Sequence, residues 1–286
     1  MNAQRDDRSK NREAAREKAK AMRLAGSARE RRNRLFLQLG LGAVALLVIG
    51  TLVAVISTAF KPEGPGPLNM ASDGIKIGQN GVAVSTPALQ PGKSPTATPA
   101  NKAGVVDITI FVDYMCPYCG AFEQTNMATI DELLSRGVAT LEVHPMAFVN
   151  TAQGLDYSTR AANAAACVAN YAPNSYLKFH NLLYTNQPAE NTPGLSNDEL
   201  ATYAQQAGAA STISDCINNG EFDGWVAGAT LRAQNGDIAV NNRDASFDKV
   251  HGTPTILING KPVEFAQPYK QEDFLNAVLA AASKNQ

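Results

Sequence analysis

The apolar positions of this 286-residue chain predict strands at both ends of a folded region, with helices between them. A continuous apolar run at 105–112 is typical of a buried strand, and a helix-like segment follows it at 121–134. Similar patterns predict further elements toward both ends: strands at 139–149, 255–258 and 262–265, and a final amphipathic helix at 271–282.

The stretch between the two groups of strands has a helical pattern, with predicted helices at 158–170, 176–184, 196–208, 211–218 and 221–234. Ser196 and Glu199 form a capping box at the start of the third of these helices. The later strands bury their faces only if they pair with the earlier ones. We therefore predict an α/β fold in which an all-helical insert, at about 155–236, interrupts one sheet.

The first 60 residues have a separate character. Residues 1–34 contain 12 basic and 5 acidic side chains, whereas residues 35–60 contain no charged side chain. The uncharged run exceeds the roughly 20 residues that a membrane-spanning helix needs. The excess of basic residues before it places residues 1–34 in the cytoplasm. The sequence thus predicts a basic cytoplasmic tail, one transmembrane helix, and an extracytoplasmic domain on the cell membrane.

Two alternatives for this region are weaker. Ser57-Thr58-Ala59 resembles a signal-peptide cleavage site, but the apolar run is longer than the roughly 7–15 residues of a signal core. A basic arm can also bind nucleic acid. Beside a membrane span, attraction to anionic lipid explains the basic charge better, so we expect an uncleaved anchor and no nucleic-acid partner.

Residues 61–103 contain seven prolines and predict a linker ahead of a domain at 104–284. Within this linker, Asn80-Gly81 lies between short β-like segments and is a strong hairpin-turn signal. We expect a small β-hairpin at 74–84, which either docks on the domain or stands alone in the linker.

The chain has four cysteines, all of them after the predicted span: Cys116, Cys119, Cys167 and Cys216. An even number in an oxidising compartment predicts two pairs. Cys116 pairs with Cys119 in a C-x-x-C motif, which leaves Cys167 and Cys216 for a structural disulfide. A second redox pair is the alternative for them, although their Ala-rich surroundings favour a structural role. Zinc is disfavoured because only two cysteines have metal-ligand spacing, so we expect no metal.

The C-x-x-C motif carries the clearest chemistry. It lies between a predicted strand and a predicted helix, where unpaired N–H groups and the helix dipole stabilise a negative charge. Cys116 is therefore predicted to be a thiolate nucleophile, with Cys119 one helical turn away. Pro117 suits the first helical position because its missing N–H needs no partner there. Tyr118, between the cysteines, is expected to tune the redox potential and substrate docking.

A second motif, Gly252-Thr253-Pro254-Thr255, directly precedes an apolar strand. Proline cannot donate a hydrogen bond to a neighbouring strand, so Pro254 is expected at a strand edge. If the Thr253–Pro254 bond is cis, the Thr253 backbone is free to hydrogen-bond an extended substrate that lies across the cysteines.

Together the C-x-x-C motif, the Thr253-Pro254 motif and the helical insert resemble the DsbA-type thiol:disulfide oxidoreductases of the thioredoxin superfamily, especially the membrane-tethered forms of Gram-positive bacteria. The resemblance covers roughly residues 104–284. It implies a thioredoxin fold with a helical insert. It also implies that Cys116 forms the mixed disulfide with substrate, that Cys119 resolves it, and that Pro254 is a cis-proline beside them.

The chain departs from that family at one position. Many thioredoxin-fold enzymes carry a buried acid six residues before the first cysteine, where this chain has Ile110. Asp113 and Glu142 are the candidates for proton handling in its place. The alternative for Asp113 is a solvated turn residue or helix cap, and for Glu142 the exposed face of an edge strand.

We therefore expect an extracytoplasmic thiol oxidase without a cofactor. Its expected substrates are unfolded secreted or membrane proteins with cysteine pairs, and its expected partner is a membrane quinone-linked protein that reoxidises it. A reductase or disulfide isomerase with the same cysteines is the first alternative. A non-enzymatic binding module, in which the C-x-x-C is only a surface disulfide, is the second.

Overall fold

The computed structural model describes residues 63–149 and 156–283. The predicted basic tail and the predicted transmembrane helix at 35–60 lie outside these residues. Within the described part of the chain, none of the helices combines the length and the apolar character needed to cross a membrane.

A mixed five-stranded sheet forms the centre of the described residues, with the order β1-β3-β2-β4-β5. Its strands are β1 (Ile75–Ile77), β2 (Val106–Val112), β3 (Ala139–Pro145), β4 (Thr255–Ile258) and β5 (Lys261–Val263). The central strand β2 pairs in parallel with β3 and antiparallel with β4. The strands that precede and follow the helical stretch therefore share one sheet, as the sequence pattern predicts.

One face of the sheet is apolar and packs against α2 (Pro117–Ser135) and α8 (Gln271–Ser283). Ile108 and Ile110 of β2 stand beside Leu141 and Val143 of β3 on this face, because alternate residues of a strand point the same way. Phe122 of α2 and Phe274 of α8 pack edge to face, with ring centroids 5.6 Å apart. This packing fixes the orientation of α2, the helix that begins at the C-x-x-C motif.

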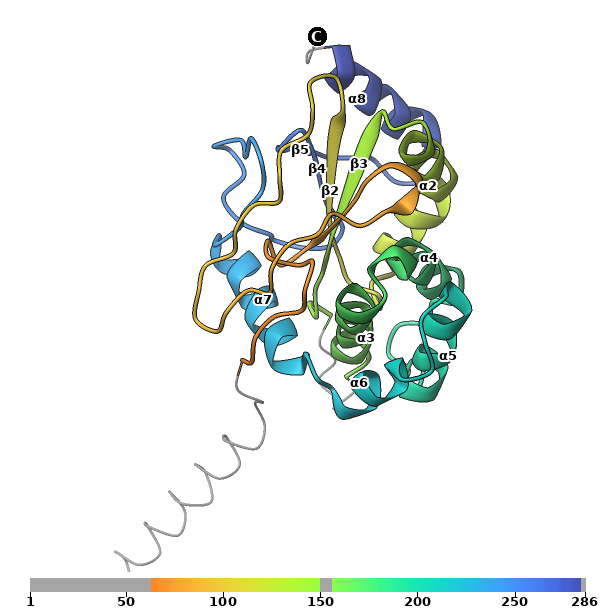
Figure 1. Cartoon of the computed structure of the whole chain (residues 1–286). Helices are drawn as coiled ribbons and strands as arrows, with labels where there is room; N and C mark the ends of the chain where they lie inside the picture. Colours follow the sequence, from red (N-terminus) through yellow and green to blue (C-terminus); the bar gives the residue numbers. More distant parts are fainter. Residues whose placement is uncertain (1–62, 150–155, 284–286) are drawn as a thin grey trace, which may run out of the picture. The chain divides into compact units, whose positions relative to one another are not determined.

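Five α-helices occupy the stretch where the insert is predicted: α3 (Tyr157–Tyr171), α4 (Tyr176–Thr185), α5 (Asn197–Ala207), α6 (Ile213–Asn219) and α7 (Asp223–Asn235). Helices α3 to α6 group together below α2, while α7 lies against the sheet on the other side (Figure 1). The disulfide joins Cys167 of α3 to Cys216 of α6, the pairing that the cysteine count predicts. It links two helices of the insert that are 49 residues apart.

Two predicted boundaries change for one reason. Strand β3 ends at Pro145 rather than at 149, because the N–H groups of Phe148 and Val149 donate to Asp113 instead of a neighbouring strand. Helix α3 has Asp156 at its N-cap rather than Ser158, whose hydroxyl also donates to Asp113. The buried Asp113 carboxylate thus accepts hydrogen bonds from groups that the sequence pattern placed in a strand or at a helix cap.

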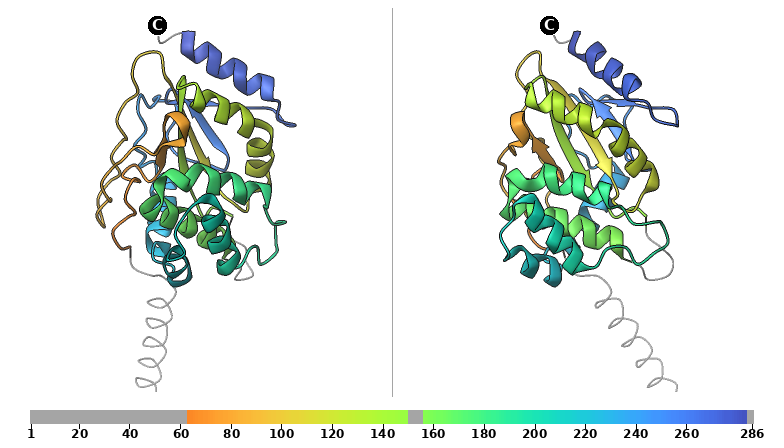
Figure 2. Two further views of the ribbon diagram at one scale, coloured as in Figure 1. Left: turned by 45° about the vertical axis from the view of Figure 1, so that its right-hand side comes forward. Right: turned by 90° about the vertical axis from the view of Figure 1, so that its right-hand side faces the viewer.

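The segment predicted as a linker is part of the folded unit, which corrects the expected domain start at 104. Ile75–Ile77 forms strand β1, which pairs antiparallel with β3, and the chain turns back so that Ala83 bridges Ile77. The predicted hairpin at 74–84 therefore docks on the domain. Strand β1 continues the sheet and Gln79 reaches Ser135 at the end of α2, while most of the rest of residues 64–103 runs over the opposite face of the sheet (Figure 2). The prolines leave this segment with only short regular elements but do not prevent its packing.

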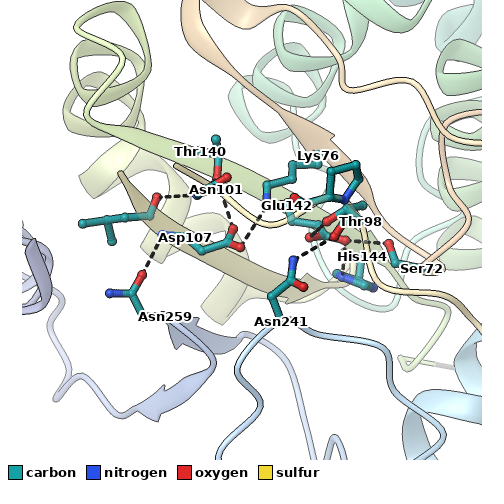
Figure 3. Close-up of polar contacts among 12 residues, drawn as sticks. Ser72, Lys76, Thr98, Asn101, Asp107, Thr140, Glu142, His144, Asn241 and Asn259 are labelled. Carbon is teal, nitrogen blue, oxygen red and sulfur yellow. Dashed lines mark hydrogen bonds and ion pairs between the residues drawn. The ribbon is translucent and has the colours of Figure 1, made fainter. Parts of the chain in front are cut away.

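Polar side chains hold this segment against the sheet, as Figure 3 shows. Lys76 of β1 is 1% exposed, and its ammonium lies 2.8 Å from the Asp107 carboxylate. Asn101 donates to Thr140 of β3, which in turn donates to Asp107. Buried charges are costly unless they are paired. These contacts therefore hold residues 64–103, here called the N-terminal segment, in this position.

A second ion-pair cluster fastens the start of the segment to α7. Arg232 donates to both carboxylate oxygens of Asp73, at 2.7 and 2.8 Å, and also to Glu63. The indole N–H of the buried Trp225 donates to Asp73 as well. These contacts join side chains that are more than 150 residues apart in the chain.

We predict that Arg232→Ala lowers the free energy of unfolding by about 3 kcal/mol, the lower end of the range for removing one partner of a buried ion pair. The loss follows because the guanidinium is the ion-pair partner of the Asp73 carboxylate, and Asp73 is only 7% exposed. Urea denaturation followed by tryptophan fluorescence measures the change.

Arg136→Ala is the matched control. Arg136 pairs with Glu132 one turn earlier on α2, and both side chains are about two thirds exposed. This change should cost less than about 0.5 kcal/mol. Equal losses in the two variants would contradict the role given to Arg232.

Candidate active site

Cys116 lies at the N-terminus of α2, directly after the turn that follows β2. It is the N-cap residue of the helix, and Pro117 occupies the first helical position. The Cys116 N–H donates to the carbonyl of Asp113, and the Cys116 carbonyl accepts from Gly120. The sulfur therefore lies where unpaired N–H groups of the first helical turn favour a negative charge.

The two cysteines differ sharply in their affinity for a proton. Hydrogen bonding from Cys119, aided by contacts with Thr253 and with backbone N–H groups, lowers the pKa of Cys116 to about 6 against the effect of burial. Cys119 is fully buried, and burial together with the neighbouring Cys116 raises its pKa well above the usual value. Near neutral pH the reduced site therefore holds a thiolate at Cys116 and a thiol at Cys119.

The Thr253-Pro254 motif lies beside the cysteines although it is 137 residues away in the chain. The peptide bond between Thr253 and Pro254 is cis. The Cys116 sulfur lies 3.3 Å from the Thr253 carbonyl oxygen. Pairing of β4 with β2 brings the motif here, because Thr255 stands opposite Phe111 near the end of β2 that leads to the C-x-x-C turn.

Cys116 itself is only 4% exposed, but exposed residues and a groove lie near it in the chain or in the fold. Tyr118, between the cysteines, is 56% exposed. A groove of about 480 Å³ runs along the cis-proline, with Pro254, Ile256, Phe265 and Tyr269 among its lining residues. Charged residues, among them Asp248, Lys249 and Glu264, also line this groove.

Asp113 is neither a solvated turn residue nor a helix cap, the alternatives that its position suggested. Its side chain is fully buried and accepts four hydrogen bonds, from the N–H groups of Met115, Phe148 and Val149 and from the Ser158 hydroxyl. Burial raises the pKa of Asp113, although these four donors oppose the effect. The carboxyl group holds the turn before Cys116 against the end of β3 and the start of α3.

Glu142 lies away from the cysteines, on the polar face of the sheet (Figure 3). Strand β3 is flanked by β1 and β2, and Glu142 is 1% exposed, so the expected exposed edge-strand position is wrong. Its carboxylate accepts from Ser72 at 2.5 Å and from Thr98 at 2.9 Å, and it lies 3.6 Å from the His144 ring. These contacts hold the N-terminal segment, and none of them reaches a sulfur.

Two groups near the cysteines were not predicted from the sequence. The Gln187 amide donates to the carbonyls of Tyr114 and Cys116, and it packs so closely on Gly120 that a side chain there would clash. Glu123 and His180 form a buried ion-pair contact between α2 and α4. The spacing of four residues between Cys119 and Glu123 on one helix was the available signal for the second group.

The structure thus brings Cys116, Cys119, Thr253 and Pro254 together, with Pro117 and Tyr118 between the cysteines and Asp113 in the turn before them, and it places Glu142 elsewhere. Cys167 and Cys216 are fixed in the helical insert. Across residues 63–149 and 156–283, no three side chains among histidine, cysteine, aspartate and glutamate come close enough to hold a metal ion.

Solved structures of thiol-disulfide oxidoreductases have folds similar to that of this chain. The reduced form of a disulfide bond oxidoreductase (DsbG) from Mycobacterium tuberculosis matches with a TM-score of 0.53 and 26% identity, over 74% of this chain and 94% of that chain. Reduced DsbA from the same organism matches with a TM-score of 0.52 and 25% identity, over 75% and 100%. BdbD from Bacillus subtilis, at 17% identity and a TM-score of 0.52 over 78% and 100%, supports the fold alone.

Curated relatives match only in part. The serine/threonine-protein kinase PknE of Mycobacterium tuberculosis is 31% identical over 166 residues, which cover 56% of this chain and 28% of the kinase. The Na(+)/H(+) antiporter NhaA 3 of Salinispora tropica is 23% identical over 276 residues, which cover 85% of this chain and 37% of the antiporter. This chain therefore spans well under half the length of these relatives.

The family comparison covers strands β2 to β5, the helical insert and the two motifs. The expected likeness to DsbA-type thiol-disulfide oxidoreductases is confirmed by the fold and by the solved structures that match it. The sequence model described as thioredoxin matches residues 99–278, more than half of the chain, and the chain therefore belongs to the thioredoxin family.

Proposed function

We propose that this protein is a thiol oxidase that introduces disulfides into cysteine pairs of secreted or membrane proteins. The observation that carries the proposal is the contrast between Cys116, with its pKa lowered to about 6, and the buried Cys119, with its pKa raised. A stabilised thiolate favours the reduced form of the enzyme, which makes its disulfide a stronger oxidant.

The reaction cycle starts from the Cys116–Cys119 disulfide. A substrate thiolate attacks the Cys116 sulfur, the bond between the cysteines breaks, and the electron pair goes to Cys119. A second substrate thiolate then attacks the substrate sulfur of the mixed disulfide and releases Cys116 as a thiolate. The substrate leaves oxidised by two electrons, and the enzyme keeps them as a dithiol.

The location and the reoxidising partner belong to the same proposal. The uncharged run at 35–60 after a basic segment supports a single membrane anchor with the catalytic domain outside the cytoplasm. An oxidase at that place needs an acceptor for its electrons. A membrane protein linked to quinones supplies one of suitable chemistry.

The reduction potential tests the direction of the reaction. We expect equilibration of the full chain with glutathione buffers to give a potential well above about −270 mV, the value for thioredoxin. The disulfide between Cys167 and Cys216 is left intact during the measurement. A potential near that of thioredoxin would contradict the oxidase and favour a reductase, while efficient repair of a scrambled substrate would favour an isomerase.

Replacement of single cysteines tests the assigned roles. We predict that Cys116→Ser abolishes thiol exchange, because the accessible nucleophile is lost. Cys119→Ser should accumulate a mixed disulfide with a peptide that contains a disulfide, because the Cys116 thiolate attacks that bond, a peptide thiolate leaves, and the resolving thiol is lost; mass spectrometry detects this adduct. An exposed disulfide without catalytic function would leave thiol exchange unchanged in both variants.

Alkylation of the reduced protein tests the charge on Cys116. The rate of reaction with iodoacetamide should rise with pH around a midpoint of about 6, because only the thiolate reacts. Cys119→Ala should move this midpoint upward, since the hydrogen bond from Cys119 is the largest cause of the lowered pKa. Ser135→Ala, an exposed change at the far end of α2, should leave the midpoint where it is.

A further inference from the structure

The side chain of Gln187 reaches the C-x-x-C turn from the helical insert, and the reaction cycle above does not use it. Gln187 lies just after α4, the helix that ends at Thr185. Its amide nitrogen lies 3.1 Å from the Tyr114 carbonyl oxygen and 2.9 Å from the Cys116 carbonyl oxygen. One side-chain amide thus donates at two points to the segment that ends at the reactive cysteine.

The surroundings of Gln187 hold this amide in place. The backbone N–H of Gln187 donates to the Tyr184 carbonyl, which also accepts from Gln124 of α2. The Tyr184 hydroxyl, in turn, donates to the Asp113 carbonyl at 3.3 Å. The end of α4 and the residues after it therefore supply hydrogen-bond donors to three carbonyl groups of the turn that precedes α2.

Gly120, directly after Cys119, is explained by the same contact. It lies inside α2, where no turn requires a glycine. Glycine is unfavourable in a helix interior relative to alanine. A side chain at this position, however, would overlap the Gln187 amide. The residue type at position 120 is therefore accounted for by the close approach of Gln187.

The Gln187 contact lies at the peptide group that joins Cys116 to Pro117. The carbonyl of this group also accepts the first hydrogen bond of α2. After the larger effect of the Cys119 thiol, the N–H groups of Cys119 and Tyr118 help to lower the pKa of Cys116. The direction of these N–H groups depends on how the first peptide plane of the helix is held, and the Gln187 amide holds its oxygen.

We propose that Gln187 is a positioning residue that raises the reduction potential of the Cys116–Cys119 pair. The inference rests on the proposed function, in which this pair exchanges with substrate. The amide holds the start of α2 so that the N–H groups of its first turn face the Cys116 sulfur. Those groups stabilise the thiolate of the reduced form more than the uncharged disulfide, so holding them in place makes the disulfide a stronger oxidant.

Gln124 makes the kind of contact that a purely structural amide would make. Its amide nitrogen lies 3.1 Å from the Tyr184 carbonyl oxygen, so it also joins α2 to α4. This carbonyl belongs to the end of α4 and not to the C-x-x-C turn. We therefore expect the loss of Gln124 to affect stability alone, and the loss of Gln187 to affect the potential as well.

Equilibration of the full chain and its variants with glutathione buffers tests the proposal. Gln187→Ala should shift the equilibrium roughly fivefold toward the oxidised enzyme, the factor that corresponds to one neutral hydrogen bond. For two electrons this lowers the potential by about 20 mV. Gln187→Glu keeps the shape but replaces the donor with a carboxylate oxygen, so it should lower the potential further. Gln124→Ala is the matched control and should keep the wild-type potential.

The pH dependence of alkylation by iodoacetamide gives a second measurement that a merely structural role would not change. The midpoint should lie higher in Gln187→Ala and Gln187→Glu than in the wild-type chain, because the Cys116 thiolate is less stabilised in these variants. The midpoint of Gln124→Ala should equal that of the wild-type chain.

Gly120→Ala covers the case in which the Gln187 variants fail to fold, because the added methyl group displaces the amide. Its potential should fall as in Gln187→Ala, and the double variant should fall no further, since both changes remove one interaction. Unchanged potentials and midpoints in folded Gln187→Ala or Gly120→Ala would overturn the inference. A wild-type potential near that of thioredoxin would instead refute the oxidase, and the differences among the variants would still test Gln187.

Discussion

The sulfur of Cys116 lies beside the N-terminus of α2, the thiol of Cys119 and Thr253. Contacts with these three groups stabilise a negative charge on it. Each partner comes from a different part of the fold. Packing on the apolar face of the sheet fixes the orientation of α2. Pairing of β4 with β2 places Thr253 beside Cys116. The sheet and the Thr253-Pro254 motif therefore both help to keep the Cys116 side chain deprotonated.

One helical turn further along α2, the surroundings of Cys119 raise the pKa of its thiol instead of lowering it. Cys119 is buried beneath Cys116, so a charge on its sulfur is disfavoured. The difference in burial and in pKa between Cys116 and Cys119 determines which sulfur reacts with substrate and which one remains buried. The helical insert contacts the active-site turn directly, because the Gln187 amide donates to the Cys116 carbonyl.

The other face of the sheet has a different construction. Where α2 and α8 cover one face with apolar side chains, the other face combines an apolar cluster under α7, which includes Phe111 and Ala233, with polar contacts to residues 64–103 (Figure 2 shows the course of the chain). The Lys76–Asp107 ion pair and the contacts of Glu142 tie this segment to β2 and β3. Arg232 holds its first residues to α7. The catalytic domain therefore begins well before β2, the central strand of its sheet.

The sequence alone determined the features that depend on residue type and local period. The reactive C-x-x-C at a helix start, the Thr253-Pro254 motif before a strand, the helical insert and the pairing of Cys167 with Cys216 are all of this kind. The tertiary structure alone decided which polar side chains are buried and what they contact. Glu142 was expected on an exposed edge, and β1 covers it. A solvated turn was the alternative to proton handling for Asp113, and three backbone N–H groups and a hydroxyl instead surround its buried carboxylate. A pattern along the chain reports amphipathicity and turns, whereas the burial of a charge depends on segments that meet only after folding.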